Sequence, residues 1–147
     1  MRVLLQRVSR ASVTIRGDRV SEIGPGLLLL VGVGKDDAFG EYDRLAQKVF
    51  NLRVFEDEDG RMNRSLSDVG AEILVVPQFT LYGDVRKGRR PSWDAAAPPE
   101  VAEDRVEAFA RALEALGASV QRGAFREHME VELVNDGPVT IWIDAEG

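Results

Sequence analysis

The stretch Ile73–Asp84, Ile-Leu-Val-Val-Pro-Gln-Phe-Thr-Leu-Tyr-Gly-Asp, decides how the rest of the chain is organised. Its first four residues, Ile73–Val76, are aliphatic, and such a run predicts a strand that is covered on both faces of a sheet. Pro77 has no N–H to donate and therefore ends the strand. Gln78 and Thr80 follow at the point where the chain leaves the sheet. A strand end that presents an amide, an aromatic ring and a hydroxyl together can form a functional site, although for this stretch alone a strand that runs into a plain loop is the commoner arrangement.

The composition is that of an ordinary globular domain. The chain has 147 residues, of which 44% are hydrophobic and 30% are charged, so we expect one domain, residues 1–147, with its own core. There is no cysteine, which excludes disulfides, thiolate nucleophiles and cysteine metal sites. His128 is the only histidine, so a two-histidine metal site is excluded and one imidazole remains for acid–base chemistry. We expect neither a metal nor another cofactor.

The sequence carries no signal for secretion or membrane insertion. The segment Met1–Arg7 has no long apolar core and no small-residue cleavage site. The longest apolar run, Leu27–Val33, is too short to cross a bilayer. We therefore expect a soluble, cytoplasmic protein without a membrane partner. The net charge of −6 argues mildly against nucleic-acid binding by the whole surface but leaves room for a local basic patch.

Apolar patterning predicts strands with two widely separated helices between them. The first helix covers residues 42–50, after a cap at Asp36 or Asp37, and the second starts at Pro98-Pro99 and ends at Gly117. The strands lie around Val3–Val8, Ala11–Ile15, Val20–Ile23, Leu27–Val33, Ile73–Val76, Ser119–Gln121, Val131–Val134 and Val139–Ile143. The expected fold is a single α+β domain with a largely antiparallel, barrel-like sheet and the two helices packed on one side.

Two hairpin features complete the pattern. Gly17-Asp18 predicts a tight turn between the second and third strands. The acidic run Glu56–Gly60 lacks the spacing of a calcium loop with its closing glutamate, so we expect a solvated turn there.

Common catalytic motifs are missing. No serine lies in a Gly-x-Ser-x-Gly elbow, and Gly32–Lys35 lacks the spacing of a phosphate-binding loop. His128 is expected at the surface or behind a site rather than in it. Gly137-Pro138, in the predicted turn before the last strand, is a plausible place for a cis peptide bond, although Gly-Pro alone is usually only a turn.

Two linked segments, Asn135–Thr140 and Gln78–Leu81, closely resemble the D-aminoacyl-tRNA deacylase family. The resemblance extends over the whole chain through further matching segments, Leu5–Val8, Ala11–Val13, Gly26–Leu28, Arg61–Asn63 and Arg90–Ser92. It implies a homodimer, without a metal or cofactor. It also implies a hydrolase that cleaves the ester between a D-amino acid and the 3′-terminal adenosine of tRNA. Such chiral proofreading rejects L-aminoacyl-tRNA.

The resemblance also implies residue roles. Gly137 and Pro138 match a cis-proline motif that is inserted across the dimer into the partner's site, where its carbonyl groups face the substrate's α-amino group and leave no room for an L side chain. Arg7 is implied to steady that motif from the other subunit. The catalytic group is implied to be Gln78, Phe79 and Thr80, with backbone N–H groups near the scissile carbonyl. Phe125 and Met129 match positions near the terminal adenosine.

The chain departs from the family pattern at two positions. Pro77 stands where the family commonly has serine, so a mechanism that needs a hydroxyl there does not apply. Ala124 stands where many relatives carry arginine or a similar residue, which weakens the expectation of adenosine contacts in that segment. Thr80 is either a nucleophile or a positioning residue, and we favour positioning because the sequence offers no adjacent base.

An aminoacyl ester is already activated, so its hydrolysis needs no acid or base side chain. A positioned water and backbone N–H donors for the oxyanion suffice, and the ribose 2′-hydroxyl is available to orient the water. Steric rejection of L side chains predicts that glycyl esters are admitted. The loop 83–91 carries the basic residues Arg86, Lys87, Arg89 and Arg90, which are candidates for tRNA phosphate contacts. The rival hypotheses are a non-catalytic RNA- or protein-binding module and a hydrolase of small D-amino-acid esters.

Overall fold

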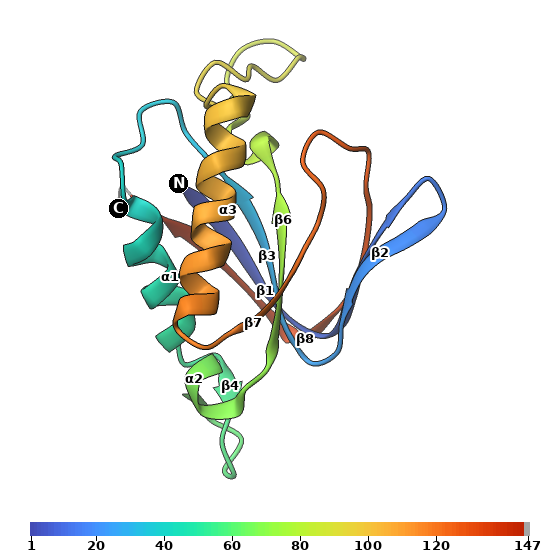
Figure 1. Ribbon diagram of the computed structural model, residues 1–147, viewed down its shortest axis with the longest axis vertical. Coiled ribbons are helices and arrows are strands. Elements are labelled where there is room, and N and C mark those ends of the chain that lie inside the picture. Colours follow the sequence, from blue (N-terminus) through green and yellow to red (C-terminus); the bar gives the residue numbers. More distant parts are fainter. Residues whose placement is uncertain (146–147) are drawn as a thin grey trace.

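The computed structural model describes residues 1–145 and consists of one curved sheet with helices against one face (Figure 1). The main sheet contains β1 (Arg2–Ile15), β2 (Asp18–Ile23), β3 (Gly26–Gly32), β6 (Glu72–Pro77), β7 (Ser119–Arg122) and β8 (Glu130–Asp144). The helices are α1 (Glu41–Asn51), the short α2 (Leu66–Val69), the 3-10 helix η1 (Phe79–Tyr82) and α3 (Pro99–Ala115). A small hairpin is formed by β4 (Phe55–Glu56) and β5 (Met62–Arg64). The predicted α+β class is confirmed.

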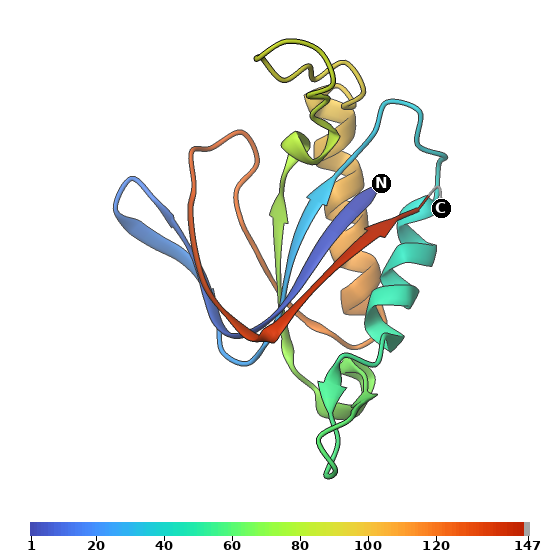
Figure 2. The same ribbon diagram turned by 180° about the vertical axis from the view of Figure 1, so that it is seen from behind.

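The sheet is mixed in direction, and its curvature is evident from both sides (Figures 1 and 2). Its strands follow the order β2-β1-β3-β6-β7, and β8 pairs with the other edge of β1. β1 is antiparallel to β2, β3 and β8, whereas β6 is parallel to both β3 and β7. The parallel pairs arise because α1 lies in the connection from β3 to β6, and α3 in the connection from β6 to β7. Both helices lie on the same side of the sheet, as predicted.

Two predicted strand boundaries were wrong. The segments Val3–Val8 and Ala11–Ile15 are one continuous strand, β1, because the exposed polar pair at residues 9 and 10 faces solvent without turning the chain. The segments Val131–Val134 and Val139–Ile143 are likewise one strand, β8, which pairs with β1 almost from end to end. Residues 135–138 are therefore an irregularity within a strand rather than a strand-to-strand turn.

Local turn chemistry agrees with the sequence at the second helix, whereas the first hairpin turn lies one residue earlier than the predicted Gly17-Asp18, because Asp18 already pairs with Ile15. Arg16 and Gly17 both have positive φ, 49° and 82°, as a two-residue turn between β1 and β2 requires. α3 has Pro99 at its first position, where the missing N–H costs nothing. The predicted aspartate cap of α1 was wrong, because that helix begins after Gly40.

Asp37 does not cap α1 but binds two groups elsewhere. Its Oδ2 accepts the Gly34 N–H at 2.8 Å, and its Oδ1 lies 2.7 Å from the ammonium group of Met1. Both partners of this ion pair are buried. Asp37 thus ties the start of β1 to the loop that follows β3.

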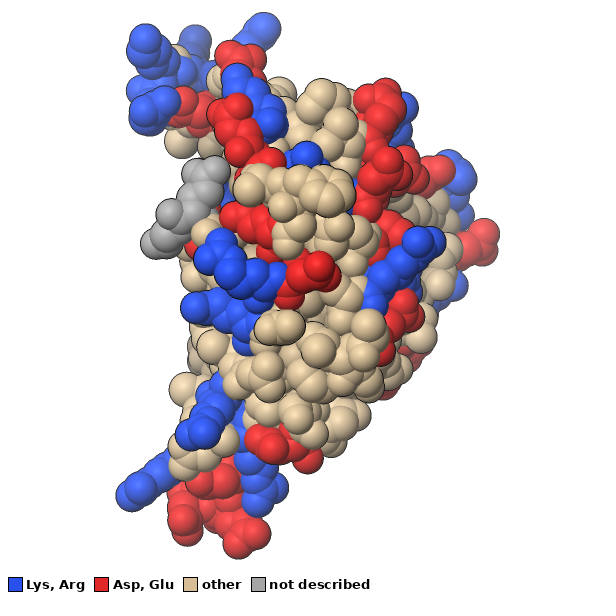
Figure 3. Space-filling model, turned by 60° about the vertical axis from the view of Figure 1, so that its left-hand side comes forward, with Lys and Arg blue, Asp and Glu red and all other residues tan. Residues whose placement is uncertain are grey.

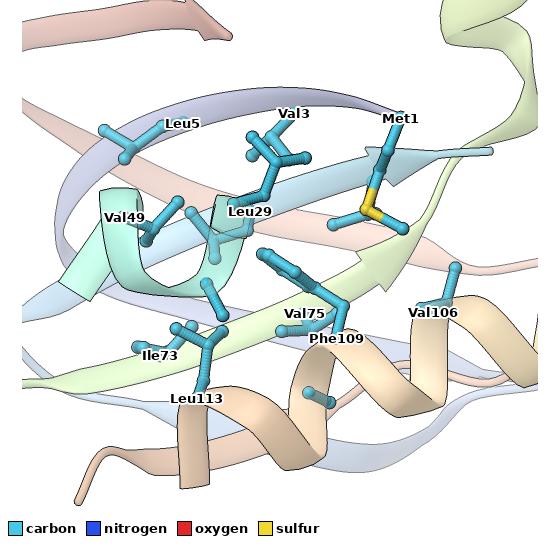
Figure 4. Close-up of a cluster of buried hydrophobic side chains, with 14 of the residues drawn as sticks. Met1, Val3, Leu5, Leu29, Val49, Ile73, Val75, Val106, Phe109 and Leu113 are labelled. Atoms are coloured by element: carbon cyan, nitrogen blue, oxygen red, sulfur yellow. The ribbon is translucent and has the colours of Figure 1, made fainter. Parts of the chain in front are cut away.

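The core has two parts, one on each face of the sheet. Alternate residues of β6 point to opposite parts: Ile73 and Val75 face the helices, and Leu74 and Val76 face the inside of the curved sheet. Phe109 of α3 and the surrounding aliphatic side chains fill the helix side (Figure 4). The prediction that this strand is covered on both faces is confirmed.

Candidate active site

The chain leaves the sheet at the end of β6 in a tightly fixed turn. Pro77 is the last residue of β6, opposite Val31 of β3, and the next N–H, that of Gln78, still donates to the Val31 carbonyl at 2.7 Å. The 3-10 helix η1 then forms, with Leu81 N–H donating to Gln78 O at 3.2 Å. Gly32 is required beside this turn, because a Cβ there would lie 2.9 Å from the Gln78 carbonyl oxygen.

This turn brings the three predicted catalytic residues together at the surface. Gln78 Nε2 donates a hydrogen bond to Thr80 Oγ1, and both Phe79 and Thr80 are exposed. The first N–H groups of a helix lack acceptors within it. Among residues 1–145, no acceptor receives the N–H of Phe79 or Thr80. Two backbone donors and an amide–hydroxyl pair therefore share one small patch.

Gly137 and Pro138 lie in a bulge that leaves the sheet. In the pairing of β1 with β8, Gln6 is opposite Thr140 and Val8 is opposite Asn135, so a single residue of β1 faces four residues of β8. The peptide bond between Gly137 and Pro138 is cis, as the sequence suggested, and both residues are exposed. The bulge, residues 136–139, is therefore open to solvent.

Asn135 closes the base of the bulge. Its Oδ1 accepts the Val139 N–H at 3.1 Å, and its Nδ2 donates to Thr140 Oγ1 at 2.9 Å. The same hydroxyl oxygen accepts a hydrogen bond from Gln6 Nε2 at 3.3 Å. Side-chain bonds thus replace the backbone ladder where β8 departs from β1.

Arg7 is the single β1 residue opposite the bulge, and it is 6% exposed. Its Nε donates to the Asp136 carbonyl oxygen at 3.2 Å, and its Nη1 donates to the Val54 carbonyl oxygen at 2.7 Å. The guanidinium also lies 3.6 Å from a Glu56 carboxylate oxygen. The resemblance implies that Arg7 steadies the motif of the other subunit, and that role stays a prediction. Within one chain, the register of β1 and β8 places Arg7 directly under its own bulge.

Phe125 and Met129 lie in the connection between β7 and β8. Met129 packs against Gly123, where a Cβ would lie 2.9 Å from its sulfur, and the Ala124 N–H points at that sulfur at 3.4 Å. Phe125 packs against the main core and also lines a cleft of about 370 Å³. The cleft lies between α3, the end of β6 and β7, and its wall includes Pro77.

The lining of this cleft includes four charged residues that sequence reasoning did not single out: Glu103, Asp104, Glu107 and Arg122. Arg122 hydrogen bonds to Glu114 at 2.7 Å and to Glu107 at 2.9 Å. The Arg122 hydrogen bond holds the pKa of Glu114 below its ordinary value, and the same bond raises the pKa of Arg122. Glu103, Asp104 and Glu107 lie on the polar face of α3 and Arg122 lies at the end of β7, so helical periodicity alone gave no signal for a cleft.

The turn at η1 and the bulge in β8 do not meet within one chain. Arg7 is in register with Leu27 of β3, which is in register with Ile73 of β6, four residues before Pro77. The offset along the strands is therefore about 13 Å, and three strand spacings add about 14 Å across the sheet. No hydrogen bond, ion pair or ring contact joins the two sites among residues 1–145.

Neither a metal site nor a membrane span is evident in the described part of the chain. No cluster of three or more histidine, cysteine, aspartate or glutamate side chains is arranged to hold a metal ion. Within the same residues, no helix has the length and hydropathy needed to span a bilayer. His128 is exposed, and within residues 1–145 no hydrogen bond or ion pair joins it to η1 or to the bulge.

Comparison with known proteins assigns the fold and then the family. A solved structure described as a probable eukaryotic D-amino acid tRNA deacylase superposes with a TM-score of 0.79 at 18% identity, over 97% of each chain. This chain therefore has the fold of a deacylase. A second structure, described as c-Myc DNA Unwinding Element Binding Protein, gives a TM-score of 0.92 at 41% identity over 98% of each chain.

Sequence comparison then identifies the family. Residues 4–144 match the family model described as D-Tyr-tRNA(Tyr) deacylase. D-aminoacyl-tRNA deacylase from Thermomicrobium roseum is 63% identical, over 99% of this chain and 94% of the relative. The protein of the same name from Symbiobacterium thermophilum is 58% identical, over 99% and 97% respectively. The chain belongs to the D-Tyr-tRNA(Tyr) deacylase family.

Proposed function

We propose that this protein hydrolyses the ester between a D-amino acid, or glycine, and the 3′-terminal adenosine of tRNA, and that it leaves L-aminoacyl-tRNA intact. Family membership supports the reaction class. The observation that carries the chiral part is the exposed Gly137-Pro138 bulge, held from below by buried Arg7. A rigid backbone wall fits steric selection, because it excludes an L side chain by shape and needs no attractive contact with it.

Hydrolysis needs little chemical assistance at this site. Water attacks the ester carbonyl carbon, the tetrahedral oxyanion forms, and the ribose 3′-oxygen leaves with a proton. The N–H groups of Phe79 and Thr80 are suited to bind the oxyanion, since neither has an acceptor among residues 1–145. The neighbouring ribose 2′-hydroxyl is suited to orient the water and carry the proton.

Thr80 acts as a positioning residue in this mechanism. The only hydrogen bond of its hydroxyl within residues 1–145 is with Gln78, which has no basic group. Activation of a threonine nucleophile needs an adjacent base. Gln78 therefore orients Thr80 and leaves the hydroxyl proton available to a bound water or ester.

The complete site requires two copies of the chain. The strand register separates η1 from the bulge within one chain, so the bulge meets the η1 turn of a partner. β8 exposes the apolar side chains of Val134 and Trp142, which lie on either side of the bulge in sequence. These side chains are suited to a contact between copies.

The cleft beside Pro77 and Phe125 is the proposed place of the terminal adenosine. Its apolar lining residues, among them Pro77, Val106 and Phe125, suit an aromatic base, and its carboxylates suit the exocyclic amino group as a donor. A phosphate is disfavoured there, because three carboxylates line the cleft. Action on aminoacyl-tRNA supports a cytoplasmic location.

Matched D-tyrosyl-, L-tyrosyl- and glycyl-tRNA test the proposal. We expect the D and glycyl esters to be cleaved and the L ester to decay at its spontaneous rate. Cleavage of D-tyrosyl-tRNA with glycyl-tRNA spared would overturn steric exclusion. If no ester is cleaved above the spontaneous rate, the enzymatic proposal fails.

The two-chain site has a separate test. Gly137→Ala and Gln78→Ala alter the bulge and the η1 turn, respectively. When the two inactive variants are mixed and allowed to exchange subunits, we expect activity that neither has alone. A mixture that stays inactive, with exchange verified by mass spectrometry, would show that each site is built by one chain.

Nucleic-acid binding without turnover is a second candidate. The specific observation in its favour is the 41% identical structure whose description names DNA binding and no hydrolysis. Tight binding of uncharged tRNA by a protein that cleaves neither D nor glycyl esters would support it.

A further inference from the structure

An exposed aromatic pair lies next to η1. Trp93 is 41% exposed and Phe79 is 55% exposed, and their ring centroids are 5.2 Å apart at 72°. Trp93 packs closely over Gly83, where a Cβ would lie 2.8 Å from the indole ring. One part of the indole is thus fixed on backbone, and the rest is open to solvent.

The basic loop between these residues is closed at its base. Asp84 and Ser92 exchange two backbone hydrogen bonds of 2.8 Å, so Trp93 is held at the point where the loop returns. Inside the loop, Arg86 pairs with Asp84 at 2.6 Å. The Arg86 hydrogen bond lowers the pKa of Asp84 to about 2, so both side chains are charged at neutral pH. Their opposite charges cancel, and the pair adds no net charge to the loop.

Three cations of the loop remain without a partner. Lys87, Arg89 and Arg90 are exposed and make no hydrogen bond or ion pair with residues 1–145. Figure 3 shows Lys and Arg side chains gathered at the end of the molecule that carries this loop. On a chain with a net charge of −6, this end is locally basic.

Exposed aromatic rings beside unpaired cations have the chemistry of a single-stranded nucleic-acid site. Bases stack on aromatic faces, and cations follow the phosphates without reading the sequence. A folded acidic protein surface would use the cations but gain little from an edge-to-face aromatic pair. The positive charge of the loop therefore favours a polyanion as the ligand, and the exposed aromatic rings favour one with unpaired bases.

We infer that Trp93, with Lys87, Arg89 and Arg90, binds the unpaired nucleotides that precede the terminal adenosine. The inference rests on the proposed function for the identity of the RNA. Phe79 connects this site to the η1 turn, since it lies between Gln78 and Thr80 and contacts the Trp93 ring. A base stacked on Trp93 thus leads the terminal ester toward η1.

The kinetic test compares two substrates, D-tyrosyl-tRNA and the D-tyrosyl ester of adenosine, which lacks the preceding nucleotides. In Trp93→Ala, we expect the ratio of kcat/KM for tRNA to that for the adenosine ester to fall about tenfold. Trp93→Phe keeps an aromatic face and should recover most of the ratio. Lys48→Gln, which removes an exposed charge on α1, should leave the ratio unchanged.

A binding test does not depend on turnover. Trp93 and Trp142 are the only tryptophans, so Trp142→Phe leaves Trp93 as the single indole reporter. A short single-stranded RNA that ends in CCA should quench its fluorescence. Replacement of Lys87, Arg89 and Arg90 by glutamine should flatten the salt dependence of log K by about 2, at about 0.7 for each phosphate contact to a single strand.

Three outcomes would overturn the inference. One is an equal loss on both substrates in Trp93→Ala, which would make Trp93 a support for Phe79. Another is an unquenched indole at saturating RNA with an unchanged ratio. The third is a shift from dimer to monomer in sedimentation of Trp93→Ala, which would assign this face to a second copy of the chain. Quenching by RNA in a wild-type protein that cleaves no ester would leave this site standing while the proposed function fails.

Discussion

Arg7 donates its Nε–H to the carbonyl oxygen of Asp136 at 3.2 Å, across 129 positions of the same chain. The bond joins the buried side of β1 to the exposed bulge of β8. It explains how four residues can leave the sheet and still be held in one conformation. The two hydrogen bonds to carbonyl groups use the planar fork of an arginine, which lysine cannot reproduce.

Arg7→Lys should therefore damage both stability and activity. It retains the positive charge but cannot reach the carbonyl oxygens of Asp136 and Val54 together. A buried acceptor left unsatisfied costs about 1–3 kcal/mol, which thermal unfolding will detect. We also expect loss of deacylation or loss of D-over-L preference. Arg10→Lys is the matched control, because Arg10 lies on the same strand but makes only an exposed ion pair. Equal effects of the two changes would show that the hydrogen bonds of Arg7 do not hold the bulge.

Gly137→Ala should be worse than glycine replacement at an open turn. Gly137 has φ 128°, and an added Cβ would lie 2.8 Å from a methyl carbon of Val139 and 3.1 Å from Arg7 Nη2. Gly60 also has positive φ, 76°, but open space around it. Chemical denaturation measures the loss of unfolding free energy in Gly137→Ala and in Gly60→Ala, and the difference between the two losses reports the steric crowding at Gly137. We expect Gly137→Ala to lose at least about 1 kcal/mol more. A difference near zero would show that the bulge yields easily.

Thr80→Val distinguishes a positioning residue from a nucleophile. Valine has nearly the same shape but offers no oxygen to Gln78. A positioning role predicts a reduction of about 10- to 100-fold in kcat, with turnover still measurable. No acyl-enzyme should be found by mass spectrometry of wild type quenched during turnover. Complete inactivity of Thr80→Val, together with an adduct on Thr80 in the wild type, would establish a nucleophile.

Pro77→Ser introduces, at the end of β6, the serine that the resemblance to the family implies. In the proposed mechanism the oxyanion donors are backbone groups further along the chain, so we expect kcat to change by less than about tenfold. The D-over-L ratio should not change. An increase well beyond that range would mean that a side-chain hydroxyl contributes to the reaction and that Pro77 has weakened it.

Acid should weaken the ion pair between Glu114 and Arg122. The Arg122 hydrogen bond lowers the pKa of Glu114, so the pair contributes stability at pH values above the ordinary carboxylate pKa of 4.5. That contribution disappears as the pH falls through the lowered value in the folded state. The difference in melting temperature between wild type and Glu114→Gln should thus shrink below about pH 4.5. A difference that stays constant down to pH 3 would show that the pair does not stabilise the fold.

Much of the fold was accessible from local pattern. The aliphatic run Ile73–Val76 correctly indicated a strand buried on both faces, and Pro77 correctly marked its end. The amphipathic helices were also found, because helical periodicity is a property of neighbouring residues. The cap of α1 was misplaced, since Asp37 is engaged by the Met1 ammonium, a contact no local pattern reveals.

In the candidate site, too, local features were predictable from the sequence and features that depend on distant residues were not. Residues 78–80 form one turn because they are consecutive, and the cis bond before Pro138 is a local feature too. The cleft beside Pro77 was not foreseen, because its carboxylates come from the polar face of α3, where charged residues are expected in any case, and its arginine comes from the end of β7.

The sequence by itself determined the elements, the end of β6 and the composition of the η1 turn, since each depends on residues a few positions apart. Only the tertiary structure decided that β1 and β8 are single long strands, that β6 runs parallel to its neighbours, and that Arg7 lies under the bulge. These features depend on strand register. Register is set by side chains that meet from distant parts of the chain, and a shift of one residue would place every one of them on the opposite face.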